Sequence, residues 1–193
     1  MIFSPCATLV QDLGVVLVGE VLSRRLIHDG RIVKLSTQRV LLPNGALTDL
    51  EVIEHPGASA ILPFLDPGQI LLIRQHRHCT GGDILEVPAG TLQPGETPED
   101  CARREIEEET GYRAGRLEPL GWIWTTPGFT TEKIFLFAAH DLEPGRLSTD
   151  ADEVIVVERM SFRDALESAV KGEITDAKTI ATLFRASARA GSR

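Results

Sequence analysis

The sequence predicts an α+β fold in which helices cover both faces of a mixed β-sheet, an α/β/α sandwich. Two observations support this prediction. Apolar, strand-like runs follow one another through most of the chain, and helix signals occur once between those runs and again near the C-terminal end. The 193 residues suit one such domain with an added N-terminal element. We expect the boundary near residue 56, with residues 1–56 forming a strand unit and residues 57–193 forming the main domain.

The N-terminal part is expected to be an antiparallel strand unit. Residues 23–54 form paired strand-like runs around the turn Pro43-Asn44-Gly45, and Asn-Gly is a strong hairpin signal. Residues 1–20 have no basic start and are interrupted by Asp12, so a strand or tail is expected there rather than a signal peptide.

In the main domain, strand and helix signals predict the residue ranges of most elements. Strands are expected at residues 58–65, 69–78, 83–90, 117–126, 132–140 and 152–160. A helix over 98–110 is predicted by Thr97 as the cap, Pro98 at the first position and Gly111 as the stop. Two more helices are expected over 161–172 and 176–190. Trp122 and Trp124 alternate on one strand, so both are candidates for the core.

Composition excludes several classes of function. The net charge of −8 gives no global field for a nucleic-acid backbone, and no apolar run approaches the roughly 20 residues that span a bilayer. We therefore expect neither a nucleic-acid partner nor membrane insertion. Cys6, Cys79 and Cys101 are far apart in the sequence, which fits a reducing compartment, the cytoplasm by default.

The helix over 98–110 carries an acidic cluster. At about 100° per residue, Glu105, Glu108 and Glu109 share one face, while Glu107 points elsewhere. Like charges at this spacing repel, so a cation is expected among them, and Mg²⁺ is a hard cation that accepts carboxylate oxygens and bridges to phosphates. Arg104 can pair with one of the carboxylates. The alternative is a solvated acidic face, which the flanking residues argue against.

Those flanking residues resemble a known motif. The Nudix box, G-x5-E-x7-R-E-U-x-E-E-x-G-U with U a bulky apolar or aromatic residue, is matched without a departure by Gly90, Glu96, Arg104, Glu105, Ile106, Glu108, Glu109, Gly111 and Tyr112. The resemblance implies the Nudix fold and hydrolysis of a nucleoside diphosphate linked to another group.

The same resemblance implies roles for these residues. Glu105 and Glu109 are the leading Mg²⁺ ligands, Glu108 supports them and takes part in catalysis, and the carbonyl of Ala89 is a further ligand. Two or three Mg²⁺ ions are expected per active site, with Mn²⁺ as the alternative metal. Glu96 and Arg104 brace the loop and helix of the catalytic centre, and Gly90 lets the backbone turn close to the metal.

Outside the box, residues 20–185 resemble the ADP-ribose pyrophosphatase branch. The similar segments are LLIRQHRH, EVPAG, TPGFTTEKIFLF with Pro127 sixteen residues after Gly111, and GEITDAKT. This resemblance implies hydrolysis of ADP-ribose to AMP and ribose 5-phosphate. Two alternatives remain open: hydrolysis of another nucleoside diphosphate sugar such as a GDP-hexose, and a non-catalytic module that binds ADP-ribose. The intact carboxylates argue against the non-catalytic module.

Substrate contacts are expected from one strand and one loop. Arg77 can hold a phosphate as a planar fork, with Arg74 as the alternate and a surface salt bridge as the competing interpretation. Pro127, Gly128 and Phe129 form a stiff loop with an aromatic beside the metal, although Phe129 can equally be a core residue. Glu132 is a candidate for binding the terminal ribose hydroxyls, or else a solvent-exposed glutamate.

The base or water-orienting carboxylate is expected in the acidic segment before the last strand. Asp150, Asp152 and Glu153 are the candidates. Relatives often carry two glutamates separated by one residue here, and Ala151 occupies the first of these positions while Glu153 matches the second. Our hypothesis assigns Glu153 as a metal ligand or the base, with Asp150 or Asp152 as the runner-up.

A homodimer is expected as well. In the ADP-ribose pyrophosphatase branch, N-terminal strands pack across a homodimer and help to form the adenine pocket, and residues 23–54 fit that role.

Overall fold

The structure is a computed structural model that describes residues 19–149 and 153–190. The chain divides into two compact units, and the boundary in the sequence falls between Val52 and Ile53. The expectations for residues 1–18 and for Asp150 and Asp152 fall outside the described residues. Within the described part, no helix is both long and apolar enough to cross a membrane.

The first unit is a three-stranded sheet. Its strands are β1 (Glu20–Asp29), β2 (Lys34–Leu41) and β3 (Leu47–Glu54), in that order, with β1 and β2 antiparallel. The turn predicted from Asn44-Gly45 forms, with Gly45 at φ 82° and the N–H of Leu42 donating to the carbonyl of Ala46 at 2.8 Å. A turn at Gly30, which was not predicted, divides the run before Pro43 into two strands.

The second unit is built on a seven-stranded mixed sheet. Five strands follow the order β10-β5-β4-β9-β8, while β6 pairs with β5 and β7 pairs with β4. The sheet is mixed because β4 and β9 run parallel, whereas the other pairs are antiparallel. The strands are β4 (Ala58–Asp66), β5 (Gln69–Arg77), β6 (Gly82–Glu86), β7 (Ala89–Thr91), β8 (Tyr112–Trp124), β9 (Lys133–Pro144) and β10 (Ile155–Ser161), and a 3-10 turn (His78–Thr80) follows β5.

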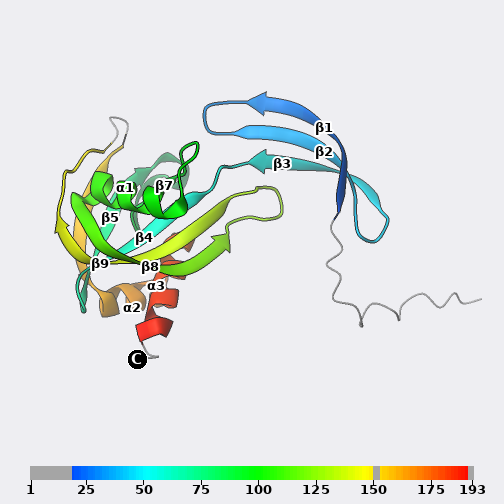
Figure 1. Ribbon diagram of the computed structural model, residues 1–193. Coiled ribbons are helices and arrows are strands. Elements are labelled where there is room, and N and C mark those ends of the chain that lie inside the picture. Colours follow the sequence, from blue (N-terminus) through cyan, green and yellow to red (C-terminus); the bar gives the residue numbers. More distant parts are fainter. Residues whose placement is uncertain (1–18, 150–152, 191–193) are drawn as a thin grey trace, which may run out of the picture. The chain divides into compact units, whose positions relative to one another are not determined.

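Helices cover both faces of this sheet, as Figure 1 shows. Because side chains alternate along a strand, neighbouring residues of β4 and β9 face opposite layers. Ile61, Phe137 and Ala139 pack in one core with residues of α1 (Pro98–Thr110). Leu62 and Ala138 pack in the other core with residues of α2 (Phe162–Lys171) and α3 (Ala177–Ala190). The predicted α/β/α sandwich is confirmed.

One core prediction was wrong. Trp122 and Trp124 do face the same way, but they are 44% and 47% exposed. The two indoles pack edge to face with ring centroids 5.4 Å apart, and the ammonium of Lys133 lies 4.1 Å from the Trp122 ring centre. The reason lies in the strand's position and alternation: β8 is an outermost strand, and Ile123 between the two tryptophans packs in the core with α2 and α3, so both indoles lie on the opposite face.

Candidate metal and diphosphate site

The acidic helix α1 is held by the local signals that predicted it. The Thr97 hydroxyl accepts the N–H of Asp100 at 3.1 Å, Pro98 occupies the first turn, and Gly111 ends the helix at φ 73°. The N–H of Gly111 donates to the carbonyl of Glu107 at 2.9 Å. The helix begins and ends where it was predicted, so the spacing of its glutamates is fixed by regular helical geometry.

Three glutamates lie on one side of α1, at different depths. Glu109 is 2% exposed and Glu105 is 8% exposed, whereas the Glu108 side chain is 42% exposed. A carboxylate oxygen of Glu109 accepts the N–H of Ala89 at 2.9 Å, which brings β7 against the helix. Glu107 points away, where it accepts the N–H of Arg146 at 3.1 Å. The structure therefore places Ala89 and Glu109 together and separates Glu107 from them.

Arg104 links the other acids of the motif. Its guanidinium donates a fork to Glu96 at 2.8 and 3.0 Å, and its Nη1 donates to Glu105 at 2.6 Å and to Glu108 at 3.0 Å. The fork from Arg104 lowers the pKa of Glu96 to about 2, and donating these hydrogen bonds to Glu96 raises the pKa of Arg104. Glu96 also accepts the N–H of Gln93 at 2.9 Å. Arg104 therefore ties the loop before α1 to the acidic face of the helix.

Gly90 is required by close packing. A Cβ atom at this position would lie 1.7 Å from a carboxylate oxygen of Glu105, so any larger residue would displace that carboxylate. The missing side chain lets β7 pass directly over that carboxylate. This close approach explains why the motif begins with glycine.

Burial and mutual repulsion disfavour the charged forms of Glu105 and Glu109. Burial, followed by repulsion from Glu105 and Glu153, raises the pKa of Glu109 to about 8. Burial also raises the pKa of Glu105, and Glu108 and Glu153 add repulsion against the opposing effect of Arg104. Carboxylates this crowded and this poorly solvated are stabilised by a hard divalent cation, which binds oxygen donors.

Metal binding requires a local exchange of partners. Across residues 19–149 and 153–190, no three His, Cys, Asp or Glu side chains converge as ligands around an ion. In this arrangement Arg104 holds oxygens of both Glu105 and Glu108. The donor set fits a hard cation in charge and chemistry, and a cation shared by these glutamates would replace hydrogen bonds from Arg104.

Glu153 lies within electrostatic reach of the same cluster. Its charge contributes to the raised pKa values of Glu105 and Glu109, which belong to a distant part of the sequence. The adjacent Val154 is fixed to β5, because its carbonyl accepts the N–H of His76 at 3.1 Å. The strand pairing of β10 with β5 thus carries Glu153 toward α1.

The two candidate arginines of β5 have different surroundings. Arg77 donates a fork to Glu86 at 2.9 Å for both bonds. Its pKa is raised chiefly by these hydrogen bonds to Glu86, and the charge of Glu109 contributes further. Arg74 instead forks onto Glu158 at 2.5 and 3.2 Å. Both arginines are ion-paired, but the partner of Arg77 is buried, so its pair is not the surface salt bridge of the competing interpretation, and the acidic cluster influences Arg77 through Glu109.

The loop between β8 and β9 is a turn with an exposed aromatic. The N–H of Phe129 donates to the carbonyl of Thr126 at 3.2 Å, across Pro127 and Gly128. Phe129 is 52% exposed, so the alternative that it is a core residue was wrong. Glu132 is partly buried and accepts the hydroxyl of Thr125 at 2.7 Å. The hydrogen bonds of this loop run to Ile53 and His55, which lead into β4.

Comparison with known proteins agrees with this geometry. A sequence model described as the NUDIX domain matches residues 54–183, well over half of the chain. The chain belongs to the Nudix family. The resemblance stated from the sequence is confirmed.

Several Nudix relatives are similar over most of their length. The chain is 38% identical to an ADP-ribose pyrophosphatase of Bacillus subtilis over 160 residues, which cover 82% of this chain and 86% of the relative. It is 37% identical to a methanol dehydrogenase activator of Bacillus methanolicus over 156 residues, 80% of this chain and 84% of the relative. A GDP-mannose pyrophosphatase of Yersinia pestis is 39% identical over 137 residues, 66% of this chain and 68% of the relative.

A solved structure shares the Nudix architecture. The crystal structure of an ADP compounds hydrolase superposes with a TM-score of 0.80, covering 90% of this chain and 95% of that chain. The sequence identity is 23%, so this similarity bears on the fold alone.

One network beside the Nudix motif was missed from the sequence. Glu86 is 1% exposed and is held by Arg77 and by the ammonium of Lys178. Burial opposes ionisation of Glu86, but the hydrogen bonds from these two cations lower its pKa overall. Lys178 also pairs with Asp176 at 3.1 Å, at the start of α3. The segment GEITDAKT thereby fastens α3 to the end of β6, a contact between residues 92 positions apart that local patterns do not reveal.

Proposed function

We propose that this Nudix protein hydrolyses the pyrophosphate bond of a nucleoside diphosphate sugar, and that ADP-ribose, giving AMP and ribose 5-phosphate, is its preferred substrate. One observation carries the catalytic part of this proposal: buried Glu109 and Glu105 lie against Ala89 and Gly90, where burial and mutual repulsion disfavour their charged forms. The relatives named as ADP-ribose and GDP-mannose pyrophosphatases support the substrate class.

The metal is proposed to be Mg²⁺, two or three ions per site, with Mn²⁺ as a substitute. Glu105, Glu108, Glu109 and Glu153 supply carboxylate oxygens for it, together with the carbonyl of Ala89. Bound there, the cations offset the diphosphate charge and polarise both the phosphorus centre and the attacking water.

Protein groups perform the remaining tasks. Glu153 is proposed to accept the proton of the attacking water at a carboxylate oxygen. Arg104 keeps Glu96 ionised through its fork, and without metal it also pairs with Glu105 and Glu108. Arg77 uses Nε and Nη2 for Glu86, which leaves Nη1 to donate to a phosphate oxygen. We favour Arg77 over Arg74 because Arg77 is the one influenced by Glu109.

The loop after β8 is proposed to contact the rest of the substrate. Phe129 presents an exposed ring, and the Pro127-Gly128 turn fixes its position. Glu132 accepts the hydroxyl of Thr125 with one carboxylate oxygen, and its other oxygen lies 3.6 Å from the imidazole of His55, so binding of the terminal ribose hydroxyls there is proposed to replace one of these contacts. The alternative substrate is another nucleoside diphosphate sugar such as GDP-mannose, because one relative carries that name and the metal and phosphate contacts would be shared.

Product analysis tests this proposal. Wild-type protein with Mg²⁺ is incubated with ADP-ribose and GDP-mannose, kcat/KM is compared, and products are separated by chromatography. We expect AMP and ribose 5-phosphate from ADP-ribose at the higher kcat/KM, and no product from Glu109→Gln. A higher kcat/KM for GDP-mannose would change the substrate, and tight binding without turnover of either compound would favour the non-catalytic module.

We also propose a homodimer formed through residues 1–56, with residues 57–193 as the hydrolase domain. The three-stranded sheet of the first unit exposes many large apolar side chains, which in a stable protein are usually covered by a partner. These side chains are Val21, Leu22, Leu26, Ile27, Ile32, Val33, Leu47 and Leu50.

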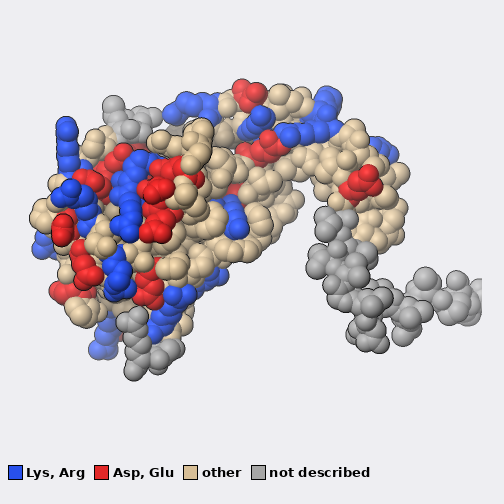
Figure 2. All heavy atoms as spheres, in the orientation of Figure 1, with Lys and Arg blue, Asp and Glu red and all other residues tan. Residues whose placement is uncertain are grey.

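Charge and cysteine content bear on other partners and location. The net charge is −8, and Figure 2 shows basic and acidic side chains interspersed on the visible face rather than a basic stripe. We propose no nucleic-acid partner. Cys79 and Cys101 are free, which is consistent with the proposed cytoplasmic location.

A further inference from the structure

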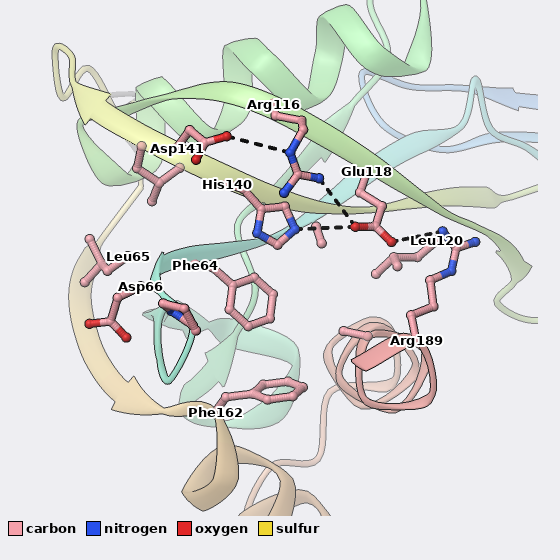
Figure 3. A pocket seen from close by; sticks show the side chains of 14 residues that line it. Phe64, Leu65, Asp66, Arg116, Glu118, Leu120, His140, Asp141, Phe162 and Arg189 are labelled. Carbon is pink, nitrogen blue, oxygen red and sulfur yellow. Dashed lines mark hydrogen bonds and ion pairs between the residues drawn. The ribbon is translucent and has the colours of Figure 1, made fainter. Parts of the chain in front are cut away.

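A separate hollow of about 730 Å³ lies on the sheet face that α2 and α3 cover. Figure 3 shows it among β4, β8, β9 and the C-terminal helices. Ala138 lines the hollow, whereas its neighbours Phe137 and Ala139 pack in the core of α1 on the other face. The sheet therefore lies between this hollow and the glutamates of α1. None of the roles proposed for the Nudix centre uses it.

Cationic groups converge on one carboxylate in this hollow. Glu118 pairs with Arg189 at 3.3 Å, with Arg116 at 3.6 Å and with the imidazole of His140 at 3.6 Å. Arg116 also lies 3.7 Å from Asp141. Both arginine side chains are half-exposed, at 49% and 50%, while Glu118 is 19% exposed. Because a guanidinium has five N–H donors, each arginine keeps donors for an anion at the mouth of the hollow.

Asp66, which also lines the hollow, is hydrogen-bonded to the backbone of its own turn. Asp66 accepts the N–H groups of Gly68 and Gln69 at 2.8 and 2.9 Å, in the turn between β4 and β5. Its carboxylate is thereby held by the turn backbone. The polar groups that remain available to a ligand are the guanidinium groups of Arg116 and Arg189.

An aromatic wall stands beside these charges. The Phe64 ring stacks on the His140 ring with centroids 5.1 Å apart and an interplanar angle of 9°, and Phe162 meets Phe64 edge to face at 5.2 Å. In Figure 3, Phe64 and Phe162 lie on one side of the hollow and Arg189 on another. The hollow thus offers apolar ring surface and guanidinium donors within one enclosure.

The backbone at the rim includes a residue with a positive φ. Asp141 adopts φ 55°, which is uncommon for a residue with a side chain. Gly115 on the neighbouring strand makes room, since a Cβ there would lie 2.7 Å from the carbonyl oxygen of Asp141. Strained positions of this kind concentrate at ligand sites. Here the residue with positive φ carries a carboxylate that lies 3.7 Å from Arg116.

We propose that this hollow binds a small aromatic anion, a planar ring bearing one carboxylate or phosphate group. The ring lies against Phe64 and Phe162, and the anionic group accepts hydrogen bonds from Arg116 and Arg189. This binding site does not depend on the proposed hydrolytic function.

Calorimetric titration in EDTA tests the chemistry of the ligand, because chelation removes metal-assisted phosphate binding at α1. The probes are phenyl phosphate, benzoate, benzyl alcohol and inorganic phosphate. We expect one of the two aromatic anions to bind at least about tenfold more tightly than benzyl alcohol and inorganic phosphate, which lack the anion and the ring respectively. The tighter of phenyl phosphate and benzoate identifies the anionic group. Failure of both to bind at millimolar concentration would overturn the proposal.

Matched variants locate the binding. Arg116→Met and Arg189→Met remove the donors and keep the stem length, and each should weaken the preferred probe at least about tenfold. Arg163→Met, on the exposed side of α2, should leave binding unchanged. Hydrolysis of ADP-ribose should persist in Arg189→Met, which separates this site from the Nudix centre.

Amide NMR of the wild-type protein provides a second readout should a variant fail to fold. Binding at the hollow should shift the signals of residues 138–142 at the end of β9. Shifts confined to α1, or affinity unaffected by both arginine variants, would contradict the assignment.

Discussion

Individual residues of the Nudix centre combine burial with charge. Glu109 is almost fully buried from solvent, yet the negative charges of Glu105 and Glu153 lie close enough to raise its pKa. The sequence predicted that three glutamates share a helical face, because that follows from helical spacing alone. It did not predict their different depths, since depth depends on how β7 crosses the helix at Gly90.

The raised pKa of Glu109 predicts how stability depends on pH in the absence of metal. Its folded-state pKa of about 8 lies above the ordinary value of 4.5, so the folded state binds the proton more tightly than the unfolded state. This contribution, on the order of a few kcal/mol, is fully present below pH 4.5 and is lost as pH rises through 8. Urea unfolding in EDTA should show the decline for wild-type protein and a flatter profile for Glu109→Gln. Equal slopes for the two proteins would show that Glu109 does not titrate in this range.

Glu153 is the residue on which the chemical step is proposed to depend. Glu153→Gln keeps the shape of the side chain and removes its charge, so kcat should fall by a factor of hundreds or more. Glu99→Gln is the matched control, because Glu99 is a 58% exposed acid of α1 that pairs with Arg103. Steady-state kinetics with ADP-ribose gives both values. A Glu153→Gln variant with the turnover of the control would assign the base elsewhere.

Elements whose signals are local were predicted well, and those set by distant pairing were not. The bounds of α1 were predicted correctly, because Thr97 and Pro98 determine its first turn and Gly111 its last turn through local backbone geometry. β8 begins at Tyr112, five residues before the expected start, because its first residues pair with the end of β9. Such pairing joins segments about 30 positions apart, and a single sequence does not show it.

The cap of α1 gives a prediction at this scale. Thr97→Ala removes the hydroxyl that accepts the N–H of Asp100, which should lower the free energy of unfolding by about 1 kcal/mol. Thr97→Ser retains that hydroxyl and should recover most of the loss. The comparison by urea unfolding is decisive for the cap, because equal destabilisation of both variants would mean that the methyl group, not the hydroxyl, matters.

At the scale of the whole molecule, the order of elements was enough to predict the layers. Strands with one inserted helix and two terminal helices predict an α+β or layered α/β/α arrangement with a mixed sheet, and the resemblance to the Nudix box implied the sandwich. Strand order was not predictable, since the parallel pairing of β4 with β9 joins segments separated by α1 and β8. The Glu86–Lys178 contact was not predictable either, because it joins residues 92 positions apart and depends on how α3 packs against the sheet.

The proposed dimer predicts a change of mass. Leu26→Asp places a charge on the exposed sheet of the first unit, so sedimentation at micromolar concentration should show a dimer for wild-type protein and a monomer for the variant. Val170→Asp makes the same change at a 75% exposed apolar residue of α2 and should remain dimeric. A monomeric wild-type protein would remove the proposal.

The central claim, that the α1 glutamates bind divalent cations, is tested most directly by anomalous diffraction from a crystal soaked in Mn²⁺. The account predicts an anomalous peak in coordination with the carboxylates of Glu105 and Glu109, and release of Glu105 from Arg104. Peaks only at other positions, with Glu105 still bonded to Arg104 and Glu109 to the N–H of Ala89, would contradict it.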